Sequence, residues 1–213
     1  PNLKFIGNLP YSAGGAIVKR FLSHPTPIQV AVLMFQKEFV DRMKAQVGTK
    51  AYGVLSLRMQ LDWDIEELRV LPPQCFLPEP IIDSTVVRFR PRQDKSELYD
   101  GLNRFDFDRL IRVGFAQRRK QLKKQLKNEP IENWQEFIGN LGLEVTVRAE
   151  ELSLEQWLKL TRYVSATEAE QAGEEALNKA QKPQEILDIE NEHDQVIGSA
   201  TRAEVHAKKL AHR

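Results

Sequence analysis

A nearly continuous apolar run, Ile28–Phe35, constrains the fold more than any other stretch of this chain. It is rich in β-branched residues and carries no charge, which is typical of a strand covered on both faces of a parallel sheet. A shorter apolar stretch, Leu3–Gly7, precedes it, and segments with helical apolar spacing follow both, at Ala16–Leu22 and Gln36–Met43. The order strand, helix, strand, helix predicts an α/β fold.

Further along, we expect one helix and two extended segments, in the order Ala51–Leu61, Asp64–Leu71 and Ser84–Arg90. In the last of these, alternation with a period of two places Val87 and Phe89 on one face and Arg88 on the other. The connector Pro72–Pro80 is dense in proline, so it is stiff and costs little further entropy to order. It is therefore suited to form a rigid pocket wall.

The tetrapeptide Asn8-Leu9-Pro10-Tyr11 follows the first expected strand. Ligands of open α/β sheets bind at the carboxyl ends of the strands, so we expect the tetrapeptide to lie in a site. The Asn8 side-chain carbonyl and the Leu9 main-chain carbonyl can accept the two hydrogens of a base amino group, while Pro10 fixes the loop. Tyr11 offers a face on which the base can stack.

Two parts of this base-binding hypothesis, the tetrapeptide and Phe76, also have ordinary structural explanations. The tetrapeptide taken alone also fits a plain turn. Phe76, the aromatic residue of the proline-dense connector, fits a core position as well as it fits a second stacking surface for an extruded base.

Composition bounds the class of protein loosely. The 213 residues are 41% hydrophobic and 29% charged with a formal net charge of +1, so any nucleic-acid signal must be local. The single cysteine, Cys75, excludes an internal disulfide and a cysteine-based zinc cluster and fits a reducing compartment. No apolar run approaches the roughly 20 residues of a membrane span. We expect a cytoplasmic monomer without a metal site.

The segment Phe107–Lys127 keeps apolar residues at helical spacing, and its other face is dominated by Arg and Lys. A solvated face normally mixes charges, but this one has no carboxylate between Asp108 and Glu129. The imbalance favours contact with phosphates over ordinary solvation. The candidate RNA-binding residues are Arg112, Arg118, Arg119, Lys120, Lys123 and Lys124.

Two shorter helices are expected at Asn133–Ile138 and Ser153–Leu160, the second with a capping box formed by Ser153 and Gln156. The predicted organisation is a partial catalytic domain, a helical RNA-binding domain, a linker of low apolar content and a further domain start, at residues 1–95, 105–164, 165–184 and 185–213.

Several motifs together resemble the ribosomal RNA adenine N6-dimethyltransferases (KsgA-like). They are Gly7–Tyr11, Gln36–Glu38 with Arg42, Ala51–Ser56, Phe76–Val87, Phe115–Lys120 and Arg148–Ser153. Their order and their span, from Pro1 to about Tyr163, make the resemblance specific. It predicts the C-terminal half of a Rossmann-like class I methyltransferase sheet, followed by a small all-α domain and an extended tail.

The resemblance implies methyl transfer from S-adenosylmethionine to the amino groups of two adjacent adenines in small-subunit ribosomal RNA, within a pre-30S particle. Asn8 and Leu9 match the amino-binding positions of the family, and Tyr11 and Phe76 its stacking aromatics. This chain departs from the family at the cofactor site, where the glycine-rich loop and the ribose-binding acid are missing. The pair Gly14-Gly15 does not replace that loop, because it belongs to a helix entrance. We therefore expect a fragment that cannot methylate by itself.

Other readings stay open. One is a ribosome-assembly or RNA-binding module without catalysis, and another is an amino methyltransferase acting on DNA, against which the proline-dense connector and the basic helical domain stand. The tail, 185–213, resembles the start of a Nudix hydrolase, with a strand, a polar turn, a strand and a helix-like Thr201–His206. A fusion is then implied, in which His193, His206 and His212 are structural.

Overall fold

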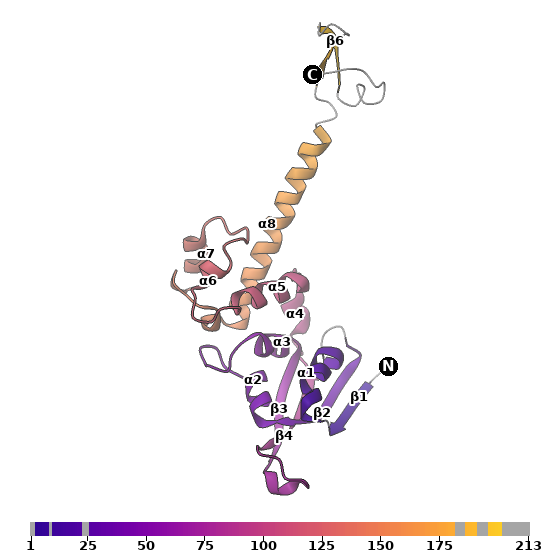
Figure 1. Cartoon of the computed structure of the whole chain (residues 1–213), viewed down its shortest axis with the longest axis vertical. Coiled ribbons are helices and arrows are strands. Elements are labelled where there is room, and N and C mark those ends of the chain that lie inside the picture. Colours follow the sequence, from indigo (N-terminus) through magenta and orange to yellow (C-terminus); the bar gives the residue numbers. More distant parts are fainter. Residues whose placement is uncertain (1–2, 9, 23–25, 182–185, 191–195, 202–213) are drawn as a thin grey trace. The chain divides into compact units, whose positions relative to one another are not determined.

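The structure is a computed structural model that describes residues 3–8, 10–22, 26–181, 186–190 and 196–201 (Figure 1). The chain divides into two compact units, Pro1–Ser165 and Ala166–Arg213. No described helix is both long enough and apolar enough to cross a membrane.

A four-stranded mixed sheet organises the first unit, with the strand order β1-β2-β4-β3. β1 (Leu3–Asn8) and β2 (Ile28–Gln36) are parallel, as predicted. β4 (Ser84–Pro91) runs antiparallel to β2 and to β3 (Trp63–Leu71), so the parallel pattern holds for the first pair only. Parallel pairing needs a long crossover, which residues 9–27 provide, whereas β3 and β4 are joined by the shorter connector.

Short helices cover one face of this sheet. They are η1 (Tyr11–Ala13), α1 (Gly14–Ile17), the π-helical η2 (Val18–Leu22), α2 (Lys37–Met43) and α3 (Val54–Asp62). Their apolar residues pack with Leu33, Phe35, Val87 and Phe89, which are essentially inaccessible to solvent. Burial of Val87 and Phe89 confirms the alternation predicted for β4. On the other face of β2, Met34 is buried but Val32 is only half-buried, so the expectation of a strand covered on both faces holds only in part among the described residues.

A second core lies among the helices that follow. These are α4 (Lys95–Tyr99), α5 (Arg104–Gly114), α6 (Leu122–Gln125), α7 (Trp134–Asn140), η4 (Ala149–Glu151) and α8 (Leu154–Gln181). α3 belongs to both cores, because Leu57 and Leu61 pack against the helices while Met59 packs against the sheet. The sheet and the helices therefore share one compact unit. The capping box at the start of α8 is confirmed by the bonds from Ser153 N to Gln156 Oε1 (2.8 Å) and from Gln156 N to Ser153 Oγ (3.3 Å).

The continuous basic helix predicted at Phe107–Lys127 was wrong. α5 ends at Gly114, turns follow, and α6 resumes for one turn only. The apolar spacing was satisfied by burial in the second core, but Leu122 N donates to Val147 O at 2.8 Å instead of to a carbonyl of the preceding turn, so α6 begins there as a separate helix. Tertiary contacts outweigh helix propensity here.

The residues expected to form a linker are helical as far as Gln181, where α8 ends. Beyond it, β5 (Ile186–Glu190) and β6 (Val196–Thr201) form an antiparallel pair, which confirms the two predicted strands, and the predicted turn between them lies outside the described residues. The three histidines of the tail and the helix-like segment after Thr201 lie outside the described residues. The proposed domain boundaries stay predictions.

Candidate functional site

The tetrapeptide lies where β1 and β2 end side by side. Asn8 is the last residue of β1, it is exposed, and it pairs in register with Met34 of β2. Tyr11 begins η1 directly afterwards. Leu9 is outside the described residues, so the position of its carbonyl remains a prediction.

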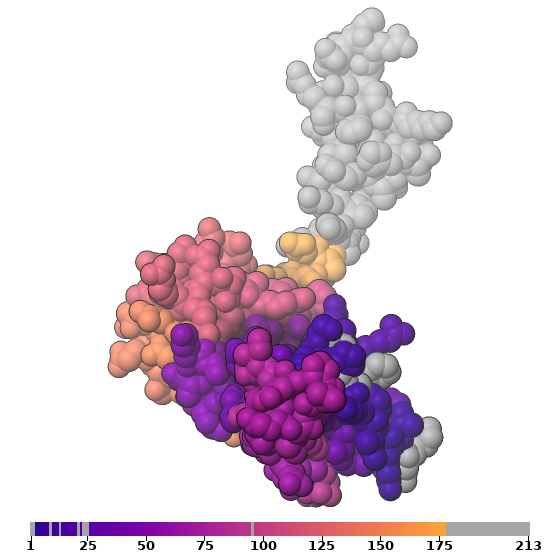
Figure 2. Space-filling view, turned by 60° about the horizontal axis from the view of Figure 1, so that its bottom comes forward, coloured from indigo at the N-terminus to yellow at the C-terminus, as the bar shows by residue number. Residues whose placement is uncertain are grey.

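A pocket of about 500 Å³ opens at this edge of the sheet. It is lined by Asn8, Pro10, Tyr11, Met34, Phe76, Leu77, Pro78 and Pro80. The structure thus brings together four of the predicted residues from two distant segments, with Asn8, Pro10 and Tyr11 from the first and Phe76 from the connector. In Figure 2 the connector, in magenta, stands forward beside the indigo residues of the N-terminal segment. We name this cavity the base pocket, after the base that the sequence predicts would bind there.

The connector forms a stiff wall of the base pocket. Its first part is the 3-10 helix η3 (Pro73–Cys75), and the Leu77–Pro78 peptide bond is cis. Phe76 is half-buried rather than a core residue, which agrees with its expected place at a site. Leu77 is fully exposed at the rim. A single conformation of this wall is favoured because each proline removes backbone freedom.

Tyr11 is anchored at its far end. Its hydroxyl is hydrogen-bonded to Oγ of Ser84, a fully buried residue that begins β4. Sequence reasoning missed Ser84 and also Met34 as site residues. No local pattern connects Tyr11 to Ser84, since the two are 73 positions apart.

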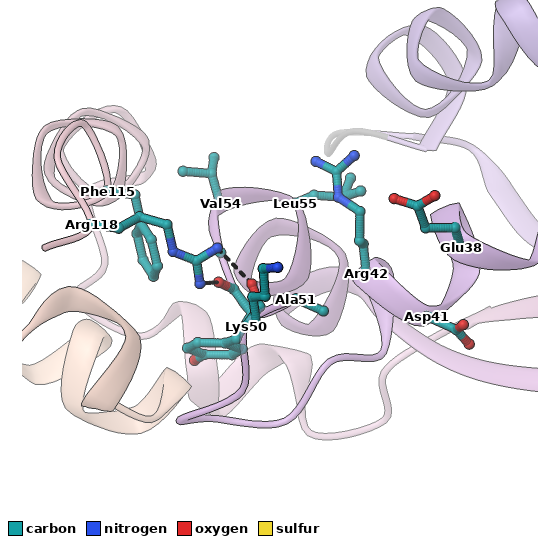
Figure 3. A pocket seen from close by; sticks show the side chains of 11 residues that line it. Glu38, Asp41, Arg42, Lys50, Ala51, Val54, Leu55, Phe115 and Arg118 are labelled. Atoms are coloured by element: carbon teal, nitrogen blue, oxygen red, sulfur yellow. Dashed lines mark hydrogen bonds between the residues drawn. The ribbon is translucent and has the colours of Figure 1, made fainter.

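A second concavity, of about 730 Å³, lies between α2, the loop before α3 and the turn after α5 (Figure 3). We name it the cationic pocket, after Arg42, Lys50 and Arg118, and its remaining lining residues are Glu38, Asp41, Ala51, Tyr52, Gly53, Val54, Leu55 and Phe115. Asp41 is paired with Lys37 at 2.8 Å. Among the described residues, neither Arg42 nor Lys50 has an ion-pair partner, so both charges are available to a ligand.

Arg118 has a structural role that the sequence did not indicate. Its Nη1 donates to Lys50 O (2.6 Å) and its Nη2 to Tyr52 O (2.8 Å), with a longer contact to Thr49 O (3.5 Å). These bonds close the loop 49–52 against the turn after α5 (Figure 3). That Arg118 binds RNA stays a prediction, and the structure adds that backbone carbonyls already hold part of its guanidinium.

The other predicted RNA-binding residues are exposed. Arg112 lies on α5 and donates from Nε to Asp108 O at 2.9 Å. The remaining four, which lie on the turn and on α6, are Arg119, Lys120, Lys123 and Lys124. Within the part of the chain that the structure describes, these four side chains make no ion pair. The local surplus of positive charge that the sequence predicted is therefore present at the surface.

A buried ionic cluster ties the sheet to the helices. Asp62, at the end of α3, accepts two hydrogen bonds from Arg104 (3.0 and 3.1 Å) and one from the Tyr99 hydroxyl. Burial, followed by the bond to Asp62, raises the pKa of Tyr99 above its ordinary value. Pairing with Asp62 raises the pKa of Arg104 although burial by itself lowers it. This cluster ties the end of α3 to α4 and to the start of α5.

The glycine pair near the base pocket does not fit a cofactor loop. Gly14 begins α1, which confirms the predicted helix entrance, and it is buried. A Cβ at Gly14 would lie 3.2 Å from Cδ1 of Phe35, so this glycine serves close packing of α1 on β2. Residues 10–22 thus offer no glycine cradle for S-adenosylmethionine.

The residues from the base pocket to the first turns of α8 match one family model throughout. Residues 1–166 match the model described as Ribosomal RNA adenine dimethylase. The chain belongs to this family. The family's match ends at residue 166, so the resemblance of residues 185–213 to a Nudix hydrolase receives no support.

Curated relatives agree with membership in the ribosomal RNA adenine dimethylase family. Two proteins named Ribosomal RNA small subunit methyltransferase A, from Synechocystis sp. and Hydrogenovibrio crunogenus, are 40% identical over 172 residues and 36% identical over 161 residues. Each alignment covers 76% of this chain and, respectively, 58% and 59% of the relative. The chain therefore spans less than two thirds of the length of these relatives.

Solved structures agree with the fold. A crystal structure of a dimethyladenosine transferase from Plasmodium falciparum matches with a TM-score of 0.64 and 25% identity, covering 78% of this chain and 68% of that chain. The structure of the 23S rRNA methyltransferase ErmE matches with a TM-score of 0.59 and 22% identity, covering 78% and 66%, and shows the fold alone. The α/β sheet of this ribosomal RNA adenine dimethylase family member is thus a methyltransferase sheet.

Proposed function

We propose that this chain holds the target base and the RNA in the S-adenosylmethionine-dependent N6-dimethylation of adjacent adenines in small-subunit ribosomal RNA. The observation that carries the proposal is the convergence of Asn8, Tyr11 and Phe76 on the 500 Å³ base pocket. An amide, two aromatic rings and a stiff wall are groups suited to hold an extruded adenine.

The chemistry concerns the adenine amino nitrogen, whose lone pair is delocalised into the ring. The side-chain carbonyl of Asn8 and the carbonyl of Leu9 would accept its two hydrogens and favour tetrahedral geometry at the nitrogen. Stacking of the base on Tyr11 and Phe76 contributes roughly 1–3 kcal/mol per contact, which is comparable to the cost of extruding it. S-adenosylmethionine, when bound, supplies the electrophilic methyl group.

The RNA backbone would lie along two cationic surfaces. One is the exposed set on the turn after α5 and on α6, and the other is the cationic pocket with its unpaired Arg42 and Lys50. Neutralisation of phosphates by these side chains releases counterions, so the affinity should fall steeply with salt. Arg118 contributes indirectly, by holding the loop that carries Lys50.

Methyl incorporation tests the proposal. The protein expressed from its complete natural reading frame is incubated with small-subunit particles and labelled S-adenosylmethionine, and the RNA is digested and examined for N6,N6-dimethyladenosine by mass spectrometry. We expect dimethyladenosine with the wild-type protein and a large loss with Asn8→Ala. RNA that is bound but acquires no methyl group would overturn the proposal in favour of the alternative below.

A non-catalytic RNA-binding module is the second candidate, and the observation that favours it is the packing role of Gly14 in place of a cofactor loop. Titration calorimetry of residues 1–213 with S-adenosylmethionine addresses this point separately. We expect no saturable binding at micromolar ligand, because the described residues lack a cofactor cradle. Micromolar affinity would contradict that expectation.

A further inference from the structure

The hydrogen bond between Tyr11 and Ser84 joins the two walls of the base pocket. Tyr11 belongs to the wall after β1, whereas Ser84 is the residue at which the connector ends and β4 begins. Ser84 is inaccessible to solvent and lies on a strand paired on both sides, opposite Gln36 of β2 and Leu71 of β3. The Ser84 side chain is therefore held in a fixed position beside the base pocket.

The bond acts on the ring that would stack on the base. Tyr11 is half-buried and belongs to a 3-10 helix of three residues, so its backbone alone fixes the ring weakly. The χ2 torsion of a tyrosine is broad, and a ring held only through Cβ samples a range of planes. A hydroxyl bonded to a buried partner fixes the ring at both ends and defines one plane.

The same residue also positions the opposite wall. The connector that carries Phe76 ends at Ser84, and the residue before it is held by a bond from Lys37 N to Asp83 O of 2.9 Å. The start of β4 therefore fixes the position of the Tyr11 ring and also that of the connector that carries Phe76. A change at this point would alter the gap between the two rings.

We propose that Ser84 is a positioning residue, which fixes the Tyr11 ring relative to Phe76 so that the gap accepts one base plane. The inference rests on the proposed function, since it assigns no chemistry to Ser84 and acts only through Tyr11. The competing explanation is that the bond serves stability alone. The two differ in whether base stacking changes when the bond is removed and the ring is kept.

The experiment uses residues 1–213 and a hairpin RNA with the adjacent adenines of the small-subunit 3′ end, one of them replaced by 2-aminopurine. Fluorescence of the bound RNA reports the fraction of 2-aminopurine stacked in the protein. The variants are Tyr11→Phe, which keeps the ring, Ser84→Ala and the double variant. Thr161→Val serves as the control, because Thr161 is also fully buried and its hydroxyl donates to Trp157 O (2.9 Å), away from the base pocket.

We expect strong quenching with the wild type and a stacking equilibrium about 5-fold weaker in each single variant, the usual effect of one hydrogen bond. The double variant should lose no more than either single variant, because the bond can be broken only once. Thr161→Val should behave as the wild type. If Ser84→Ala does not fold, as circular dichroism would show, the comparison of Tyr11→Phe with Thr161→Val decides.

Two failures are distinguishable. Wild-type quenching that persists unchanged in Tyr11→Phe, or additive losses in the double variant, would overturn the role of Ser84 and leave the proposed function in place. RNA that binds without any quenching by the wild type would overturn the base pocket itself, and the inference with it.

Discussion

Substitution of two adjacent arginines, Arg118 and Arg119, distinguishes the structural role of the basic turn after α5 from its proposed role in RNA binding. Arg118 donates two well-formed hydrogen bonds to the carbonyls of Lys50 and Tyr52, whereas Arg119 is exposed and unpaired among the described residues. Hydrogen bonds from a charged donor contribute about 1.5–3 kcal/mol each when sheltered, and solvent at this exposed site weakens them. We therefore expect Arg118→Ala to lower the free energy of unfolding by about 2 kcal/mol.

Urea denaturation followed by circular dichroism measures this loss, and thermal scans should show a midpoint lower by about 4–8 °C. Arg119→Ala should stay within about 0.5 kcal/mol of the wild type. Arg118→Lys adds a third comparison, since it keeps the charge but cannot bridge the carbonyls, and it should be destabilised like the alanine variant.

For the salt dependence of RNA binding, we expect the substitution of Arg119 to have the larger effect and that of Arg118 the smaller. Arg119→Ala should flatten the plot of log affinity against log salt by about 0.7–0.9, the loss of one phosphate contact, while Arg118→Lys should keep the wild-type slope. Fluorescence anisotropy with a labelled hairpin at several salt concentrations gives these slopes. The reasoning is refuted if Arg119→Ala destabilises the protein as much as Arg118→Ala, or if its salt slope does not change.

Asn8→Ala should reduce methyl transfer by the natural protein about 100-fold and RNA affinity less than about 3-fold, since its bond strengthens as the nitrogen becomes tetrahedral; equal losses in the two assays would exclude that role. Gly114→Ala should lower the free energy of unfolding by about 2 kcal/mol, because its Cβ would lie 2.5 Å from Cη2 of the buried Trp157. Gly139 lies on α7, and a Cβ there would have nothing within 4 Å, so Gly139→Ala should raise the free energy of unfolding by about 0.5–1 kcal/mol. Urea titrations in which both glycine variants changed the free energy of unfolding in the same direction would contradict the packing described for Gly114. Burial raises the pKa of Tyr99, so above about pH 10 the unfolded chain loses this proton first and stability falls by up to about 1.4 kcal/mol per pH unit. Thermal midpoints between about pH 9 and 11 should fall less for Tyr99→Phe than for the wild type, and parallel curves would refute this contribution.

The strands and the base pocket could be predicted from the sequence because the patterns that indicate them are local. The alternation at Ser84–Arg90 reports which face meets the core, and it holds because neighbouring side chains of a strand must point to opposite faces. The tetrapeptide at Asn8 was placed correctly at the end of β1 because a proline after an apolar run ends a strand. Phe76 joined the same pocket because the connector has few conformations available.

The continuity of the basic helix could not be predicted from spacing. Phe107, Ile111, Leu122 and Leu126 are all buried as the helical pattern requires, yet the chain leaves the helix after Gly114. Burial of an apolar residue is compatible with several backbone paths through the same core. The path chosen here lets Arg118 reach carbonyls that are 66 to 69 positions away in the sequence.

The sequence by itself determined the strands, the alternation of faces in β4, the place of the tetrapeptide at the end of β1 and the local excess of positive charge, because each depends on residues that are close together along the chain. Only the tertiary structure decided which cations remain free, that Ser84 anchors Tyr11, and that α3 serves two cores. Hydrogen bonds and packing between distant segments are selected by the folded geometry as a whole, and no short pattern of residues encodes the partner.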